Sequence, residues 1–167
     1  MARCFAIARV HLPHGGLTPK RINMKTLLLS LLLLCSASAA TVSICQSDVV
    51  AATLVLEAGG ETNDNGMVAV YEVIRNRARL GNKTLMEVCL ARLQFSCWNG
   101  VTDVAKTIAK AKRHKKWNDA VFVVNHAYKT DWTKGATCYH SNKMSVFPSW
   151  AKRMTCVGSV GNHIFYK

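Results

Sequence analysis

Two helical patterns joined by a pair of glycines constrain this chain more than any other feature. The segment Val49–Arg79 begins with an apolar helical run that carries Glu57 near its end, and Gly59-Gly60 then stops it. Positions 50, 53, 54 and 57 fall on one helical face, so Glu57 shares an apolar stripe. Loss of water at such a place favours the neutral form of a carboxylic acid. We therefore expect Glu57 to be a general acid at the floor of a cleft.

The same residues also admit a structural interpretation. Glu57 at a helix end could instead pair with Arg75 or Arg77 of the following helix. Cleavage of a glycosidic bond usually needs a carboxylic acid and a second group that handles the anomeric carbon. Glu61 could supply that group or could be a turn residue. The glycines break the helical geometry after Glu57, so the spacing leaves both roles open.

The first 40 residues have the composition of a targeting segment. Met24-Lys25-Thr26 gives a short basic start, residues 27–34 are apolar except for Ser30, and small residues fill 36–40. This pattern is typical of a signal peptide, and the apolar run is short for a membrane span. We expect an upstream extension over 1–23, a signal peptide over 24–40 and an exported domain over 41–167. A lipoprotein anchored at Cys35 and a retained leader are the minor alternatives.

The charge of the exported part favours an anionic partner. All nine acidic residues lie at or after Asp48, whereas five of the 22 basic residues precede position 40, which leaves a formal charge of +8. Cell wall polymer, anionic lipid and nucleic acid all attract such a domain. The basic run Lys106–Lys116 is either a solvated helix face or an anion-attracting rim. No aromatic residue interrupts it, which argues against nucleic acid.

Cysteine usage is compatible with export. Seven cysteines occur, and the two at positions 4 and 35 would leave with the leader. Five cysteines remain, so at least one is unpaired or intermolecular, and we expect a disulfide between Cys89 and Cys97 or between Cys138 and Cys156. No C-x2-C, H-x3-H or H-E-x-x-H pattern occurs, so neither a zinc site nor another metal site is predicted. No P-loop or G-x-G-x-x-G motif suggests a cofactor.

Local signals predict a helical first part and a β-like last part, an α+β arrangement. Periodicity favours helices over about 48–58, 67–80 and 117–128, a short helix after the Thr84–Glu87 capping box, and a helix from Asp103 with Val104, Ala105 and Ile108 inward. Residues 136–140 and 162–166 are expected to form short strands. Trp98, Tyr139 and Trp150 lie in irregular stretches with polar neighbours, a combination that suits sugar binding.

Short motifs then follow one another in a characteristic order. They are LVLEAGGE at 54–61, GMVAV at 66–70, VIRNR at 73–77, QFSCW at 94–98, GATCYH at 135–140, PSWA at 148–151 and GNHIFY at 161–166. Together they resemble the SleB/CwlJ-type cell wall hydrolases over residues 48–167. Two features depart from that family: Cys138 stands where its members commonly have His, and the spacer between His140 and Pro148 is short.

The resemblance implies a lysozyme-like α+β fold, with a helical N-terminal part and a small C-terminal β-rich part, that acts on peptidoglycan strands. It implies Glu57 as the catalytic acid, Glu61 in support, and lytic transglycosylation that needs no cofactor. The substrate-binding residues it indicates are Ser96, Trp98, Thr137, Tyr139, His140, Asn162 and His163. We expect a monomeric exported enzyme. A muramidase or glucosaminidase that uses water, and a non-catalytic basic wall-binding protein, remain alternatives.

Overall fold

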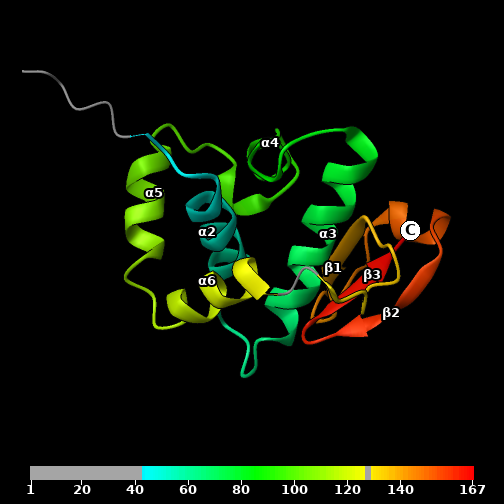
Figure 1. The fold of residues 1–167 in the computed structure, drawn as a ribbon. Helices are drawn as coiled ribbons and strands as arrows, with labels where there is room; N and C mark the ends of the chain where they lie inside the picture. Colours follow the sequence, from blue (N-terminus) through cyan, green and yellow to red (C-terminus); the bar gives the residue numbers. More distant parts are fainter. Residues whose placement is uncertain (1–42, 127–128) are drawn as a thin grey trace, which may run out of the picture. The chain divides into compact units, whose positions relative to one another are not determined.

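The computed structural model describes residues 43–126 and 129–167. The predicted upstream extension over 1–23 and signal peptide over 24–40 lie outside the described residues, as does the end of the helix expected to reach 128. The elements are α2 (Gln46–Ala58), α3 (Asn65–Gly81), α4 (Leu85–Leu90), η1 (Ser96–Trp98, a 3-10 turn), α5 (Val104–Ala111), α6 (Trp117–His126), β1 (Cys138–Ser141), η3 (Ser149–Arg153, also 3-10), β2 (Cys156–Val160) and β3 (His163–Tyr166). The helical first part and the β-rich end confirm the expected α+β class (Figure 1).

Helix α2 lies at the centre of the helical part and contacts α3, α4, α5 and α6 (Figure 1). Every residue from Val49 to Val55 is buried, so this helix has no polar face along that length. A helix that is apolar all round belongs in a core. Its one buried hydroxyl, Thr53, accepts a hydrogen bond from Trp98 Nε1 at 2.9 Å. Glu57, by contrast, is half-buried in the last turn.

Helix α3 separates the helical core from the sheet (Figure 1). Met67, Val70 and Ile74 pack into the core around α2. Ala69 and Val73 point to another face of α3 and pack with Phe165 of β3. The helix ends at Asn82, whose φ of 48° gives the left-handed cap that asparagine tolerates. The sheet therefore rests on a helix that is itself anchored in the core.

A buried carboxylate of α3 holds the chain segment that leads to the sheet. Glu72 is fully buried and accepts hydrogen bonds from Trp132 N at 2.9 Å and from Thr133 N at 2.7 Å. The Thr133 hydroxyl donates a third bond, also at 2.7 Å. Because three donors satisfy it, Glu72 is structural, and no sequence pattern indicated this role.

Two further side chains of α3 fix the start of β1. Asn76 Nδ2 donates to the Ala136 carbonyl at 2.9 Å, and Arg77 Nε donates to the Thr137 carbonyl at 2.6 Å. The motif at 73–77 thus acts on the backbone just before Tyr139. This anchoring sets the position from which Tyr139 reaches the end of α2.

The helix caps confirm part of the sequence prediction and correct another part. Thr84 and Glu87 form the expected capping box of α4. Asp103 caps α5 by accepting from Lys106 N, and the predicted inward face of α5 is confirmed for Val104 and Ile108 but wrong for Ala105. Ile108 and Ala111 are buried, Val104 is half-buried and Ala105 is exposed. None of the helices in the described ranges is long and apolar enough to cross a bilayer.

The three strands form an antiparallel sheet in the order β1-β3-β2. Strand β2 was not predicted, because it is exposed at three of its five positions and its register slips between Cys156 and Gly158. The expected disulfides are absent, since all five described cysteines are free. Cys138 and Cys156 both lie opposite Tyr166, on either side of β3. Two strand spacings of about 4.8 Å put them too far apart for a disulfide.

Candidate active site

A cleft of about 570 Å³ opens where the end of α2 meets β1 and β3. Its lining residues come from segments far apart in the sequence: Leu56, Glu57, Ala58, Gly60, Glu61, Arg77, Gln94, Ser96, Tyr139, His140, Ser141, Lys143, Met144, Asn162 and His163. Both carboxylates of the cleft come from the region around the end of α2: Glu57 lies in the last turn of α2, and Glu61 follows Gly59-Gly60. The sheet supplies the aromatic and histidine side chains. The cleft therefore depends on the anchoring of β1 by α3.

Glu57 is held in this cleft by donors on both carboxylate oxygens. Its Oε1 accepts from the Ser96 hydroxyl and from Cys97 N, each at 3.2 Å. Its Oε2 accepts from the Tyr139 hydroxyl at 2.9 Å. The alternative pairing of Glu57 with Arg77 does not occur, since Arg77 bonds backbone carbonyls instead. Glu57 is thus fixed in orientation while remaining half-buried.

The side-chain donors around Glu57 stay protonated near neutral pH. Burial raises the pKa of the Tyr139 phenol well above its ordinary value, and the charge of Glu57 raises it further. Burial likewise raises the pKa of the Cys97 thiol, and the Glu57 carboxylate adds to this effect. A phenol and a thiol that keep their protons can serve as hydrogen-bond donors. Neither group competes with Glu57 as a base.

Glu61 has a different environment in the same cleft. It is 8% exposed, and its Oε1 accepts from Asn162 N at 3.1 Å. Its Oε2 has no hydrogen-bond partner in the described part of the chain. A Cβ added at Gly66 would lie 2.2 Å from Oε2, and one at Gly161 would lie 1.9 Å from it. The carboxylate therefore sits in a cradle that both positions can form only as glycine.

His163 links Glu61 to the catalytic side of the cleft. Its Nδ1 lies 3.0 Å from Glu61 Oε1 but out of hydrogen-bond alignment, so the contact is electrostatic. Burial lowers the pKa of His163, and the nearby Glu61 carboxylate only partly opposes this. The neutral ring meets the Tyr139 ring edge-on, with centroids 4.9 Å apart. A chain of contacts thus runs from Glu61 through His163 and Tyr139 to Glu57.

The other predicted substrate-binding residues are distributed unevenly. Ser96, His140 and Asn162 line the cleft, together with Tyr139 and His163. Thr137, which directly precedes β1, lines an adjacent cavity instead. Trp98 lines neither cavity, because its ring is 8% exposed in the helical core and its indole N–H is used by Thr53. Trp98, which was expected to bind substrate, is therefore a core residue.

His140 reaches the cleft from a second aromatic cluster. Its Nδ1 lies 2.9 Å from the Ser141 carbonyl, and its Nε2 lies 2.9 Å from the Tyr166 hydroxyl. A carbonyl can only accept, so Nδ1 donates to it, and the Tyr166 hydroxyl can pair with Nε2 as donor or acceptor. The rings of Phe147 and Trp150 also contact His140. His140 is thereby fixed in orientation as a wall of the cleft.

Several cleft residues were not assigned to the site from sequence. Arg77, Gln94, Lys143 and Met144 line it. Arg77 and Gln94 belong to recognisable motifs, which could have suggested them, whereas nothing marked Lys143 or Met144. The sequence could not predict the hydrogen bond from Cys97 N to Glu57, because almost any residue at that position offers the same backbone N–H. Across residues 43–126 and 129–167, no group of three or more potential metal ligands gathers.

Comparison with known proteins supports the motif analysis. The chain resembles the catalytic domain of the Bacillus cereus SleB protein with 25% identity over 75% of this chain and 93% of that one, at a TM-score of 0.48. No curated protein matches the sequence. Residues 61–166 match the family described as Cell Wall Hydrolase, a segment that contains Glu61, Tyr139 and His163 but begins after Glu57. Because this match spans more than half of the 167 residues, the chain belongs to the Cell Wall Hydrolase family, whose substrate is peptidoglycan.

Proposed function

We propose that this protein is an exported lytic transglycosylase. It cleaves the bond between N-acetylmuramic acid and N-acetylglucosamine, with Glu57 as the single acid and base. The observation that carries this proposal is the contrast between the two cleft carboxylates. Glu57 is half-buried and held by donors on both oxygens, whereas Glu61 is buried in a glycine cradle.

The hydrogen bonds of Glu57 indicate where its catalytic proton resides. Cys97 N can only donate, so Oε1 stays an acceptor in every protonation state. The acid form then carries its proton on Oε2, next to the Tyr139 hydroxyl. A hydroxyl can donate to a carboxylate or accept from a carboxylic acid by rotating. Tyr139 therefore suits a Glu57 that alternates between acid and base.

The reaction requires one proton to leave Glu57 and one to return. Protonated Glu57 gives its proton to the glycosidic oxygen as the bond to the muramyl anomeric carbon breaks. The C6 hydroxyl of the same muramyl sugar forms the new bond to that carbon. Ionised Glu57 takes the hydroxyl proton, which yields a 1,6-anhydro sugar and restores the acid.

The environment of Glu61 favours this route over one that uses water. A hydrolase commonly places a second carboxylate where it can activate water or attack the sugar. Glu61 lines the cleft, but its Oε1 is engaged by Asn162 N and lies beside His163. Its burial leaves little room for a water nucleophile. The substrate hydroxyl removes the need for that second carboxylate.

Export agrees with the location of the substrate. Peptidoglycan lies outside the cytoplasmic membrane, and the sequence pattern over 24–40 is that of a signal peptide. The excess of basic residues in the domain that follows complements an anionic wall polymer. We therefore assign the enzyme to the periplasm, the cell envelope or the extracellular space.

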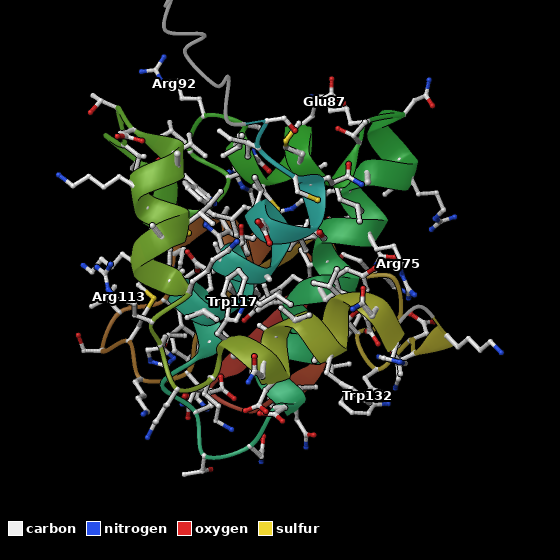
Figure 2. All side chains as sticks on the ribbon, turned by 60° about the vertical axis from the view of Figure 1, so that its left-hand side comes forward. Arg75, Glu87, Arg92, Arg113, Trp117 and Trp132 are labelled. Carbon is white, nitrogen blue, oxygen red and sulfur yellow. The ribbon has the colours of Figure 1, made fainter. Side chains whose placement is uncertain are left out.

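Digestion of purified sacculi with Glu57→Gln tests the catalytic assignment. The amide cannot donate and recover a proton in the same way, so the rate should fall by about 10³-fold. Glu87→Gln is the matched control, because Glu87 is exposed on α4 (Figure 2) and glutamine preserves a capping box. Unchanged turbidity loss with Glu57→Gln would remove Glu57 as the catalytic acid, and absence of turbidity loss with the wild type would favour a non-catalytic wall-binding protein.

Mass spectrometry of the products distinguishes the two enzymatic routes. A transglycosylase leaves 1,6-anhydro-muramyl ends, which are lighter than reducing ends by one water. Reducing ends in the wild-type digest would show a muramidase or glucosaminidase and would contradict the intramolecular route. The same digest of the Glu61→Gln variant should still yield anhydro ends, since Glu61 has no proton to transfer in this mechanism.

A further inference from the structure

A second cavity of about 550 Å³ adjoins the catalytic cleft. The two cavities share Arg77, Gln94 and Tyr139 as a common wall. Beyond that wall the second cavity is lined by Leu93, Thr137, Cys138, Trp150 and Met154, and we call it the Leu93 cavity. Because Tyr139 also bonds Glu57, a substituent on a sugar bound at Glu57 has a short path into this cavity.

Leu93 itself is an outlier in two respects. Its side chain is 72% exposed, and its backbone has a φ of 61°. The left-handed region costs a non-glycine residue about 1–2 kcal/mol. The turn here, closed by Gln94 N on the Ala91 carbonyl, would form more easily with glycine or asparagine. A strained, exposed leucine at a cavity rim points to a contact made outside the folded chain.

Arg77 gives the shared wall a positive charge. Its Nε and Nη1 donate to the carbonyls of Thr137 and Gln94, and the guanidinium lies 5.1 Å from the Phe95 ring centroid. These partners are neutral, and within the described ranges Arg77 forms no ion pair with a carboxylate. The Leu93 cavity therefore combines apolar side chains and the polar groups of Gln94 and Thr137 with one cation that has no carboxylate partner in the described ranges.

We propose that the Leu93 cavity binds the stem peptide of the muramyl sugar held in the cleft. This inference rests on the proposed function and adds a second recognition element to the same substrate. The stem peptide leaves the muramyl ring through a lactyl group and an alanine, which are apolar, and then carries free carboxylates. Leu93 and Met154 match the apolar part, and Arg77 matches the carboxylates.

A further sugar of the glycan strand fits this cavity less well. Sugar sites combine an aromatic face with polar groups for several hydroxyls. Trp150 offers a ring, and Gln94 and Thr137 offer hydrogen-bond partners, but a neutral sugar leaves the charge of the Arg77 guanidinium without a counter-charge. The chemistry of the lining therefore favours a peptide with carboxylates over a neutral sugar.

Two substrates test the proposal directly. One is intact sacculi, and the other is the same glycan strands after an amidase has removed the stem peptides. The wild type should cleave the intact strands about tenfold faster, a typical gain from a few apolar and polar contacts. The measurement is the ratio of the two rates of anhydro-muramyl end formation. This ratio cancels differences in enzyme concentration and folded fraction.

Charge substitutions at the exposed Leu93 then test whether this cavity causes the difference in cleavage rate. Leu93→Glu repels the stem carboxylates and neutralises Arg77, so the ratio should fall several-fold. Leu93→Lys should leave the ratio near its wild-type value or raise it. Leu80→Glu and Leu80→Lys are the matched controls, because Leu80 is 67% exposed and lines neither cavity. Both control variants should retain the wild-type ratio.

Three results would overturn the proposal. Equal wild-type rates on intact and stripped strands would show that no stem peptide is recognised. An unchanged rate ratio in Leu93→Glu would show that the stem peptide does not bind in this cavity. An equal fall of the ratio in Leu80→Glu would show that the added negative charge acts wherever it is placed. In each case continued anhydro products would leave the proposed function intact. If the wild type cleaves neither substrate, the proposed function itself is contradicted.

Discussion

Tyr139 and Ser96 bond opposite oxygens of Glu57, which allows their contributions to be separated. Tyr139→Phe removes the hydrogen bond that Oε2 accepts from the phenol but keeps the ring against His163. We expect kcat to fall by about 10–100-fold with little change in KM, the size of effect seen when one group at a catalytic atom is lost. Steady-state rates on solubilised glycan strands measure both constants.

The matched variant is Ser96→Ala, which leaves Oε1 with its bond from Cys97 N. Its loss of kcat should be the smaller of the two, because Oε1 keeps a donor. A rise in KM with unchanged kcat in Tyr139→Phe would assign Tyr139 to substrate binding alone.

His163 makes the stability of the domain depend on pH. Its pKa is lowered from the ordinary value of 6.5, mainly by burial. The unfolded chain therefore takes up a proton at His163 more readily than the folded chain does. This contribution to stability is complete above pH 6.5 and is lost as the pH falls towards the lower folded value. Urea unfolding midpoints should accordingly decline between about pH 7 and 5.

The His163→Gln variant isolates this contribution. Glutamine does not titrate, so the decline between pH 7 and 5 should be shallower, whatever the absolute stability of the variant. An equally steep decline would assign the pH dependence to other groups. Glu87 has a lowered pKa as well, but its effect falls below pH 4.5 and outside this window.

Residue-level sequence reasoning succeeded where a motif names a side chain and failed where the backbone acts. Glu57, Tyr139 and His163 were expected in one site and lie in one cleft. Trp98 belongs to an equally clear motif, yet its ring fills the core, because a motif does not report which way a ring points. The Cys97 N–H and the free state of the cysteines depend on backbone positions that only the fold determines.

At the scale of elements, the start of α3 is fitted to the carboxylate of Glu61. Gly66 lies in the first turn of α3, where alanine is normally more stabilising than glycine by about 1 kcal/mol. Here the added Cβ would meet Glu61 Oε2 at 2.2 Å. The carboxylate has little freedom to withdraw, because Gly161 and Asn162 N enclose it. We expect Gly66→Ala to destabilise the domain by about 1–3 kcal/mol in urea titrations.

A double-mutant cycle identifies the cause. On a Glu61→Ala background the obstacle is gone, so Gly66→Ala should become stabilising, as in an ordinary helix. The sign of the Gly66→Ala effect should therefore reverse between the two backgrounds. Destabilisation of similar size in both would show that something other than the Glu61 carboxylate opposes the methyl group.

The helices were predictable and the sheet was only partly so, for physical reasons. Helix α2 is a nearly continuous apolar run that ends at a pair of glycines, α3 has clear apolar periodicity, and Thr84 and Glu87 mark the start of α4 by local chemistry alone. Strand β2 has few buried positions and a bulge at Gly158, so it lacks the alternation that identifies a strand. The inward face of α5 was predicted correctly at Val104 and Ile108 but not at Ala105, because eight residues give periodicity too little length to define the edge of the face.

At the scale of the whole domain, the basic run Lys106–Lys116 begins in α5 and continues past its end. Some of its cations form ion pairs with carboxylates and others do not. Lys112 pairs with Asp48 at 2.8 Å, and Lys116 pairs with Asp64 at 2.7 Å. These two lysines hold helices together. Four cations of the run form no ion pair in the described part of the chain: Lys106, Lys110, Arg113 and Lys115. The spacing of Lys106, Lys110 and Arg113 places these three on one face, and Figure 2 shows Arg113 extending from the end of α5.

Unpaired cations on one face concentrate the positive field of a domain that carries a formal charge of +8 after position 40. We expect replacement of Lys106, Lys110 and Arg113 by glutamine to weaken binding to sacculi by about tenfold at low salt, since clustered charge steers anionic partners. The difference should vanish near 1 M salt, where the screening length is about 3 Å. Pelleting of labelled protein with sacculi across a salt series measures both effects.

We expect binding to sacculi to depend on where these charges lie and not only on how many there are. A control that replaces Arg79, Lys83 and Arg92 by glutamine lowers the net charge equally, and its targets are exposed around α3 and α4. If the field of the α5 face guides the enzyme to the wall, the control should retain most of the low-salt affinity. An equal loss would mean that net charge alone governs binding. The cleavage rate at saturating substrate should stay unchanged in both variants, because none of the six side chains lines the cleft.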